Sequence, residues 1–191
     1  GEIRATAMAA STANAQSDSI DDAWSQVNTV ARAEARGIEA AGGGSVIIEN
    51  SGSIDAVATA IATAVGRGDS GGDGYGEVHM TVDPTAIAAG ISVGDATSCA
   101  IYNHEGSTIG VASTIVNAQY LNGDENAVVG RHWNHGVEAE ATAHGIVTGN
   151  GEVAITNDGT IQVDLNTTID VKTYSRSTTR STTTNTAGST A

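Results

Sequence analysis

Residues 54–65 alternate without a break between two kinds of side chain. The small set is Ala56, Ala58, Ala60, Ala62 and Ala64, and the larger set is Val57, Thr59, Ile61, Thr63 and Val65. Alternation with period two over this length predicts a β-strand, and we expect its alanine face to be buried. Similar alternations begin at Ile3, Ile109 and Ile161.

Landmarks recur in the same order along the chain, which indicates an internal repeat. A Gly-Ile pair preceded by alternating alanines occurs at residues 37–38, 90–91 and 145–146, so successive pairs are 53 and 55 residues apart. An apolar-x-Ile-x-Asn run follows each pair, at 46–50, 99–103 and 153–157. A glycine and an isoleucine then open the next long alternation. Each unit is therefore predicted to contain three strands.

The repeat predicts an all-β, β-solenoid-like fold with about three and a half units of about 53 residues. The units cover about residues 1–52, 53–106, 107–159 and a partial 160–174, and form a single domain over 1–174. A Ser/Thr-rich tail follows at 175–191, with almost no apolar residues. We expect this tail to need neighbouring strands, from its own chain or another copy, to become ordered.

The segment from Ser19 to Arg36 is ambiguous. Ser19 is a good helix cap, two aspartates follow it, and Trp24 and Val27 are spaced as on one helix face. However, the counterpart in the next unit contains Pro84, which would cost about 3 kcal/mol inside a helix. The third counterpart, residues 137–145, alternates cleanly. A strand is favoured, and the helix remains an alternative.

Composition restricts both the core and the possible partners. The chain has no Phe, one Pro, 24 Gly and only 3% aromatic residues, so its core must be thin and made of small side chains. The formal net charge is −14, with 22 acidic and 8 basic residues. Such a chain is poorly suited to bind nucleic acid, and it lacks the apolar runs needed to insert into a membrane. Its first residues, Gly1 and Glu2, suit a processed chain or a segment of a longer one.

The three asparagines that close the apolar-x-Ile-x-Asn runs, Asn50, Asn103 and Asn157, occupy the same place in each unit. Their recurrence predicts a structural ladder in which each side-chain amide bonds to the next. Cys99 aligns with Val46 and Val153, which we expect to face inward, and is interpreted as a buried thiol rather than a nucleophile.

Acidic loops recur between the first and second strand of each unit. Asp69, Asp73 and Asp124 are the candidate calcium ligands among them, although their spacing follows no strict motif and a solvated turn is the alternative. No other cofactor is expected. His132 and His135 lie in an expanded loop, where a packed surface loop is favoured over a zinc site. No catalytic residues are predicted, and the chain is interpreted as not being an enzyme.

Residues 139–146 and 155–161, with their earlier copies at 31–54 and 86–109, carry a family resemblance. The pattern resembles the repeat regions of large bacterial surface proteins, namely autotransporter passengers and repetitive adhesins. This resemblance implies a parallel β-solenoid at the cell surface or in an extracellular fibre, and no defined chemistry.

These observations predict a structural or adhesive extracellular protein that assembles head to tail into a filament through strand edges. The chain opens and closes on the long alternating strand, so Ile3, Ala5 and Ala7 at one end and Ile161, Val163 and Leu165 at the other are the assembly candidates. A carbohydrate-active β-helix enzyme and a glycan- or ice-binding solenoid with a threonine-rich face are the alternatives.

Overall fold

A computed structural model describes residues 1–19, 23–70, 75–123, 128–129, 135–175 and 186–190 of the chain. Within these residues the protein is all-β, and its strands are parallel and lie in three sheets. We call them sheets A, B and C.

The strands of each sheet come from successive repeats. Sheet A contains, in spatial order, β1 (Glu2–Ser19), β4 (Ser53–Ser70), β7 (Thr108–Gly123) and β11 (Thr160–Ser175). Sheet B contains β2 (Ala23–Ala40), β5 (Tyr75–Val93), β9 (His135–Thr148) and β12 (Thr186–Thr190), with the short β8 (Val128–Val129) paired to β5. Sheet C contains β3 (Ser45–Asn50), β6 (Ser98–Asn103) and β10 (Glu152–Asn157).

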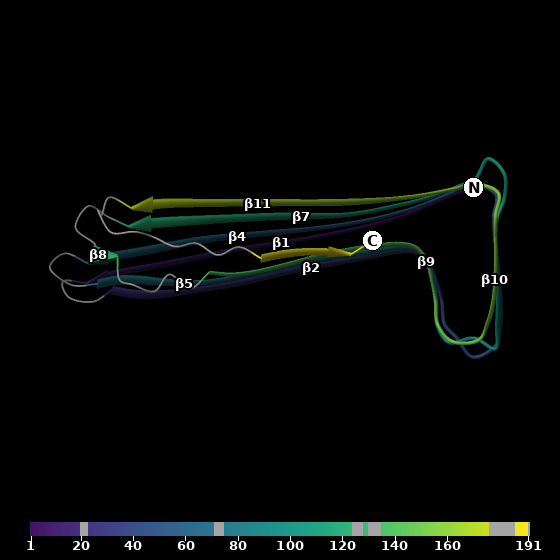
Figure 1. Cartoon of the computed structure of the whole chain (residues 1–191), viewed down its shortest axis with the longest axis horizontal. Coiled ribbons are helices and arrows are strands. Elements are labelled where there is room, and N and C mark those ends of the chain that lie inside the picture. The colour runs from purple at the N-terminus through teal and green to yellow at the C-terminus, as the bar shows by residue number, and fades with distance from the viewer. Residues whose placement is uncertain (20–22, 71–74, 124–127, 130–134, 176–185, 191) are drawn as a thin grey trace.

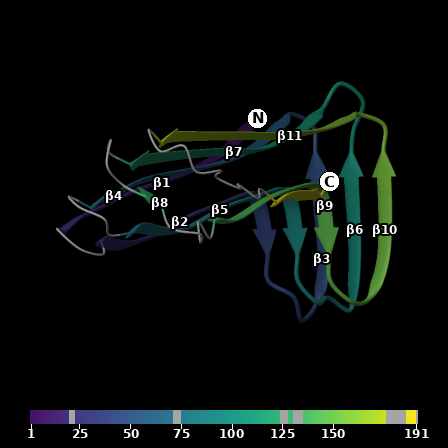
Figure 2. The same cartoon turned by 60° about the vertical axis from the view of Figure 1, so that its left-hand side comes forward.

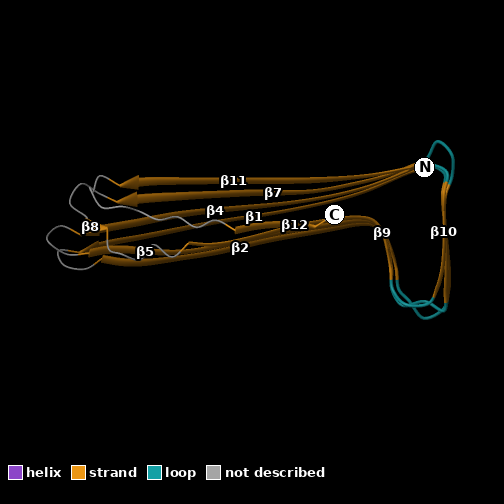
Figure 3. Cartoon of the chain, viewed as in Figure 1, coloured by secondary structure: helices purple, strands orange, loops and turns teal. Residues whose placement is uncertain are grey.

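The chain visits the sheets in the order A, B, C and then returns to sheet A one strand further along. Sheets A and B form two long layers that face each other, and sheet C stands across one end of them (Figure 1). A rotated view shows the strands of each sheet side by side (Figure 2). Loops lie at the corners around sheet C (Figure 3). The three predicted strands of a unit therefore enter three different sheets.

Equivalent landmarks lie in register. In sheet A, Ile3 pairs with Ile54, Ile54 with Ile109, and Ile109 with Ile161. Side chains at equivalent positions therefore form rows that cross the sheet from strand to strand.

The core is a thin layer between sheets A and B. Ala56, Ala58, Ala60 and Ala62 on β4 are all 0% exposed, which confirms the predicted strand and its buried face. The facing strands β2, β5 and β9 contribute mostly alanine and valine. Small side chains on both layers let the two backbones approach closely.

The described part of the ambiguous segment, from Ala23 onward, is a strand. β2 spans Ala23–Ala40, and from Trp24 to Arg36 its side chains are alternately exposed and buried, so the helix alternative is wrong. Pairing of Ala31 with Pro84 places the proline within the matching strand β5. The β5–β9 ladder is interrupted at Asp83 and Pro84, as expected for a residue without an N–H donor. Tertiary pairing outweighs the local helix signals.

Part of the Ser/Thr-rich tail at 175–191 belongs to the sheets. β11 extends to Ser175, and Thr186–Thr190 forms β12, which pairs in parallel with β9 so that Ala187 lies beside Ala139. The described residues thus supply a short fourth strand to sheet B, where the sequence predicted three copies of this element. Residues 176–185 lie outside the described part of the chain.

The recurring glycines mark a close approach at the corner where sheet B turns toward sheet C. A Cβ atom on Gly90 would lie 2.3 Å from Cγ2 of Ile109 and 2.7 Å from the carbonyl oxygen of Gly145. Gly37 meets Ile54 in the same way, and Gly145 meets Ile161. Glycine is needed because the first isoleucine of the following sheet A strand fills this space.

Candidate functional site

The three predicted asparagines form a hydrogen-bonded ladder at the corner where the chain passes from sheet C to sheet A. Asn50 Nδ2 donates to Asn103 Oδ1 at 2.8 Å, and Asn103 Nδ2 donates to Asn157 Oδ1 at 2.6 Å. This is the amide-to-amide arrangement expected from the repeat. All the bonds run in one direction, from the first repeat toward the third, so the ladder has a polarity.

Corner loops hold these asparagines in place. The Gly52 N–H donates to Asn50 Oδ1 at 3.1 Å, and Ser107 Oγ donates to Asn103 Oδ1 at 2.7 Å. Gly106, just before Ser107, has a φ of 77°, a left-handed conformation that glycine adopts at little cost. Asn103 is only 1% exposed, so its hydrogen bonds are shielded from water.

The assembly candidates lie on the outermost strands of sheet A. Ile3 is 42% exposed and Ile161 is 37% exposed, whereas Ile54 and Ile109 in the same row are 1% and 0% exposed. Val163 is 38% exposed against 2% for Val111 in its row. Ala5, Ala7 and Leu165 are partly buried and pack against the core. These side chains face the core, but nothing in the described residues covers their outer side.

Sheet C shows a further apolar edge that the sequence reasoning did not select. Val153 and Ile155 on β10 are 43% and 48% exposed, whereas their row neighbours Cys99 and Ile101 are 5% and 0% exposed. The inward orientation expected for Val153 is therefore not accompanied by burial, because β10 is an edge strand. The sequence signal that could have identified this edge is the alignment of Val153 with Cys99 in the repeat.

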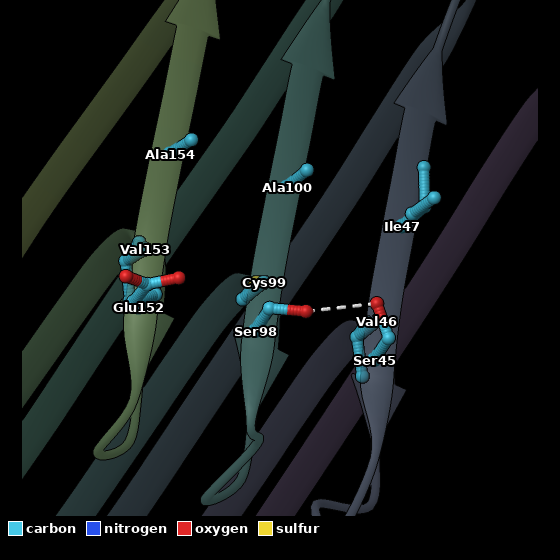
Figure 4. A pocket seen from close by; sticks show the side chains of 9 residues that line it. All are labelled: Ser45, Val46, Ile47, Ser98, Cys99, Ala100, Glu152, Val153 and Ala154. Atoms are coloured by element: carbon cyan, nitrogen blue, oxygen red, sulfur yellow. Dashed lines mark hydrogen bonds between the residues drawn. The ribbon is translucent and has the colours of Figure 1, made fainter.

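A shallow groove of about 450 Å³ lies against sheet C (Figure 4). Three successive residues of each short strand line it: Ser45, Val46, Ile47, Ser98, Cys99, Ala100, Glu152, Val153 and Ala154. The Ser45 and Ser98 hydroxyls share a hydrogen bond of 2.8 Å across β3 and β6 (Figure 4). The Cys99 thiol is buried, as predicted. The groove offers apolar surface and a few hydrogen-bonding groups.

Two buried amides interrupt the apolar core between sheets A and B. Asn117 and Gln119 on β7 are both 0% exposed, and their side-chain nitrogen and oxygen atoms have no hydrogen-bond partner among the described residues. Their row neighbours on β4 are Ala62 and Ala64. Such groups cost free energy when they replace apolar side chains, because their hydrogen bonds to water are lost on folding.

The predicted calcium ligands cannot be placed. Asp69 lies in β4, but its side chain is outside the described part of the structure, and Asp73 and Asp124 are outside it entirely. His132 is also outside it, and of His135 only the backbone, in β9, is described. Among the side chains that are described, no group of three or more His, Cys, Asp or Glu could hold a metal ion. Calcium binding stays a prediction.

Among the described residues, no helix is long and apolar enough to cross a membrane. Comparisons with protein-family models, with curated proteins and with solved structures find no match to this chain.

Proposed function

We propose that this chain is a β-solenoid-like protein with a structural or adhesive role, which assembles head to tail into extracellular or cell-surface filaments. In this proposal one repeat forms one coil, and the coils stack through sheets A, B and C. Further copies of the same chain are the partners, and strand edges are the contact surfaces. No reaction is assigned to the chain.

The observation that carries the proposal is the contrast within each row of side chains. Core-facing residues that are fully buried in the middle of the stack are about two-fifths exposed on the end strands, as Ile3 and Ile161 show against Ile109. Burying apolar surface stabilises by roughly 25 cal/mol per Å², so a further coil at either end is favourable. Repeat proteins normally cover such ends with polar caps.

Unpaired strand edges support the same conclusion. Among the described strands, β1 pairs with β4 alone and β11 pairs with β7 alone. Each end strand of sheet A is 16 or more residues long, so it presents a long row of backbone donors and acceptors to a new strand. Pairing with another copy satisfies these groups and covers the apolar rows together.

The net charge of the chain and its family resemblance both support a secreted or surface-exposed filament. A formal charge of −14 keeps the lateral faces solvated and mutually repulsive, which directs association toward the ends. The resemblance to repetitive bacterial surface proteins favours an extracellular location and an adhesive or structural role.

Sedimentation velocity and negative-stain electron microscopy over a range of protein concentrations test the proposal. The unaltered chain should form linear particles that lengthen with concentration. Val163→Asp places a charge on the core-facing row of β11 and should leave short species. Asn166→Asp, which adds the same charge on the exposed outer face of that strand, is the matched control and should still assemble. If the unaltered chain stays monomeric at high concentration, the proposal is refuted.

A further inference from the structure

Resting on the proposed function, we infer that the joint between copies has one polarity and one register. β11 of one copy pairs in parallel with β1 of the next, and Ile161 lies beside Ile3 of the partner copy. The joint therefore continues the row that Ile3, Ile54, Ile109 and Ile161 already form within one chain. Three independent features of the end strands support this arrangement.

The first feature is side-chain size. The core-facing row of β1 is small, with Ala5, Ala7 and Ala9, whereas that of β11 is large, with Val163, Leu165 and Ile169. The same combination is already buried inside the molecule, where Val111 lies beside Ala56 and Ile115 lies beside Ala60.

Joining two like ends loses this match. It also loses the parallel pairing, because two β1 edges, or two β11 edges, can keep their core faces on one side only if the two strands run antiparallel. Only the joint between unlike ends continues the parallel pairing of the described sheet A strands.

The second feature is the direction of the backbone hydrogen bonds. Ser53 N–H donates to Gly1 O at 3.1 Å, and Thr108 N–H donates to Gly52 O at 2.9 Å. Successive residues of a strand direct their N–H and C=O groups to opposite sides, so Glu2, which aligns with Ser53, directs its N–H toward the open edge. In the inferred register this N–H meets the carbonyl group of Gly159 of the partner copy, which continues the series.

The third feature is charge on the outer face. In the inferred register Arg4 lies across from Gln162 of the partner copy and diagonally from Asp164. Gln162 Nε2 donates to Asp164 Oδ2 at 2.9 Å, which holds the carboxylate on the outer face of β11. Diagonal neighbours on a sheet are within reach of a long arginine side chain. A joint between two β1 edges would leave Arg4 without this carboxylate.

Sheet C supplies the competing joint, in which β10 of one copy pairs with β3 of the next. The two joints exclude each other. The β3 strand of the second copy can pair with β10 of the first copy only if β1 of the second copy occupies the position that β11 of the first copy already fills. The β1–β11 joint is favoured because it pairs strands of 18 and 16 residues, whereas β3 and β10 have 6 residues each. With the β1–β11 joint, β10 of the first copy and β3 of the second copy lie two strand spacings apart, about 9.6 Å, and do not pair.

Cysteine pairs test the register in a Cys99→Ala background. Met8 and Asn166 are exposed, lie on the outer face and are directly opposite each other in the inferred joint. A chain with Met8→Cys and Asn166→Cys should form a ladder of disulfide-linked multimers under mild oxidation, visible on a non-reducing gel. Met8→Cys with Thr59→Cys, which are neighbours within one chain, checks that this geometry closes a disulfide. Met8→Cys with Gln162→Cys shifts the register by four residues and should yield at least tenfold less multimer.

Three results would overturn the inference. Equal ladders from the shifted pair would exclude a single register. Dimers from Met8→Cys alone would indicate a joint between two β1 edges. Ladders from Glu49→Cys with Thr156→Cys, which face each other only in the sheet C joint, would identify the competing joint. Sedimentation of the same samples separates these results from failure of the proposed function, in which no assembly forms at all.

Discussion

Replacing Asn103 with alanine tests whether the amide ladder holds the coils together. The Asn103 side chain accepts hydrogen bonds from Asn50 Nδ2 at 2.8 Å and from Ser107 Oγ at 2.7 Å. It also donates to Asn157 Oδ1 at 2.6 Å and to Thr160 O at 3.4 Å. Two of the partners, Asn50 and Ser107, are themselves buried, with 6% and 2% exposure.

The expected loss follows from these contacts. Asn50 Nδ2 keeps a weaker bond to Thr108 O at 3.3 Å, and Ser107 Oγ keeps its bond to His104 O, so neither partner becomes fully unpaired. The weakened bonds of Asn50 and Ser107 cost about 1 kcal/mol each, and the small cavity costs about 1 kcal/mol more. Asn103→Ala should therefore lower the free energy of unfolding by about 3 kcal/mol.

Urea unfolding followed by far-UV circular dichroism measures this change, at protein concentrations low enough to keep the chain monomeric. An unchanged m-value would show that the loss reflects stability rather than a change in the unfolded state. Asn157→Ala is the matched control, because Asn157 occupies the same row on the exposed strand β10. Its loss weakens one bond of Asn103 and should cost about 1 kcal/mol.

The comparison between the two variants decides the question. Equal losses for Asn103→Ala and Asn157→Ala would refute the reasoning, since burial of the ladder would then add nothing to its bonds.

Two further predictions concern the corner and the core. Gly90→Ala should destabilise the fold by more than about 3 kcal/mol, because its Cβ would lie 2.3 Å from Ile109 Cγ2, whereas Gly44→Ala should be nearly neutral since nothing lies within 4 Å. Thermal unfolding of both variants checks this, and similar melting temperatures would contradict it. Asn117→Leu combined with Gln119→Met should raise the free energy of unfolding by about 1–2 kcal/mol, because it removes buried amide groups that have no partner in the described part of the chain and keeps side-chain size. Urea unfolding measures the gain, and a loss would mean that ordered water bonds to these amides.

Sequence patterns predicted the strands and their rows because both depend on neighbouring positions along the chain. The alternation of residues 54–65 and the spacing of Asn50 and Asn103 were sufficient to predict a buried strand and a ladder. The segment from Ser19 to Arg36 was harder, because its cap and its Trp24–Val27 spacing favour a helix while the pairing with β5 that determines its structure is not local.

The arrangement of the sheets and the exposed edge of β10 could not be predicted in the same way. Alternation shows that one face of a strand is buried, but it does not show which strand covers that face. Val153 and Cys99 have equivalent sequence surroundings, yet one is exposed and the other buried, because exposure depends on whether a further strand lies beside them. The predicted role of the Asp69 loop remains a prediction because its side chain lies outside the described residues.

The spacing of the ladder also has a mechanical consequence. Asn50 and Asn103 are 53 residues apart along the chain but are joined by a single hydrogen bond across neighbouring strands. Each repeat therefore adds only about 4.8 Å to the length of the stack, while the same residues drawn out fully would span roughly 180 Å. Under tension, a repeat that peels away from the end releases a length of chain about 37 times its folded length. Such a protein would act as a store of extensible chain.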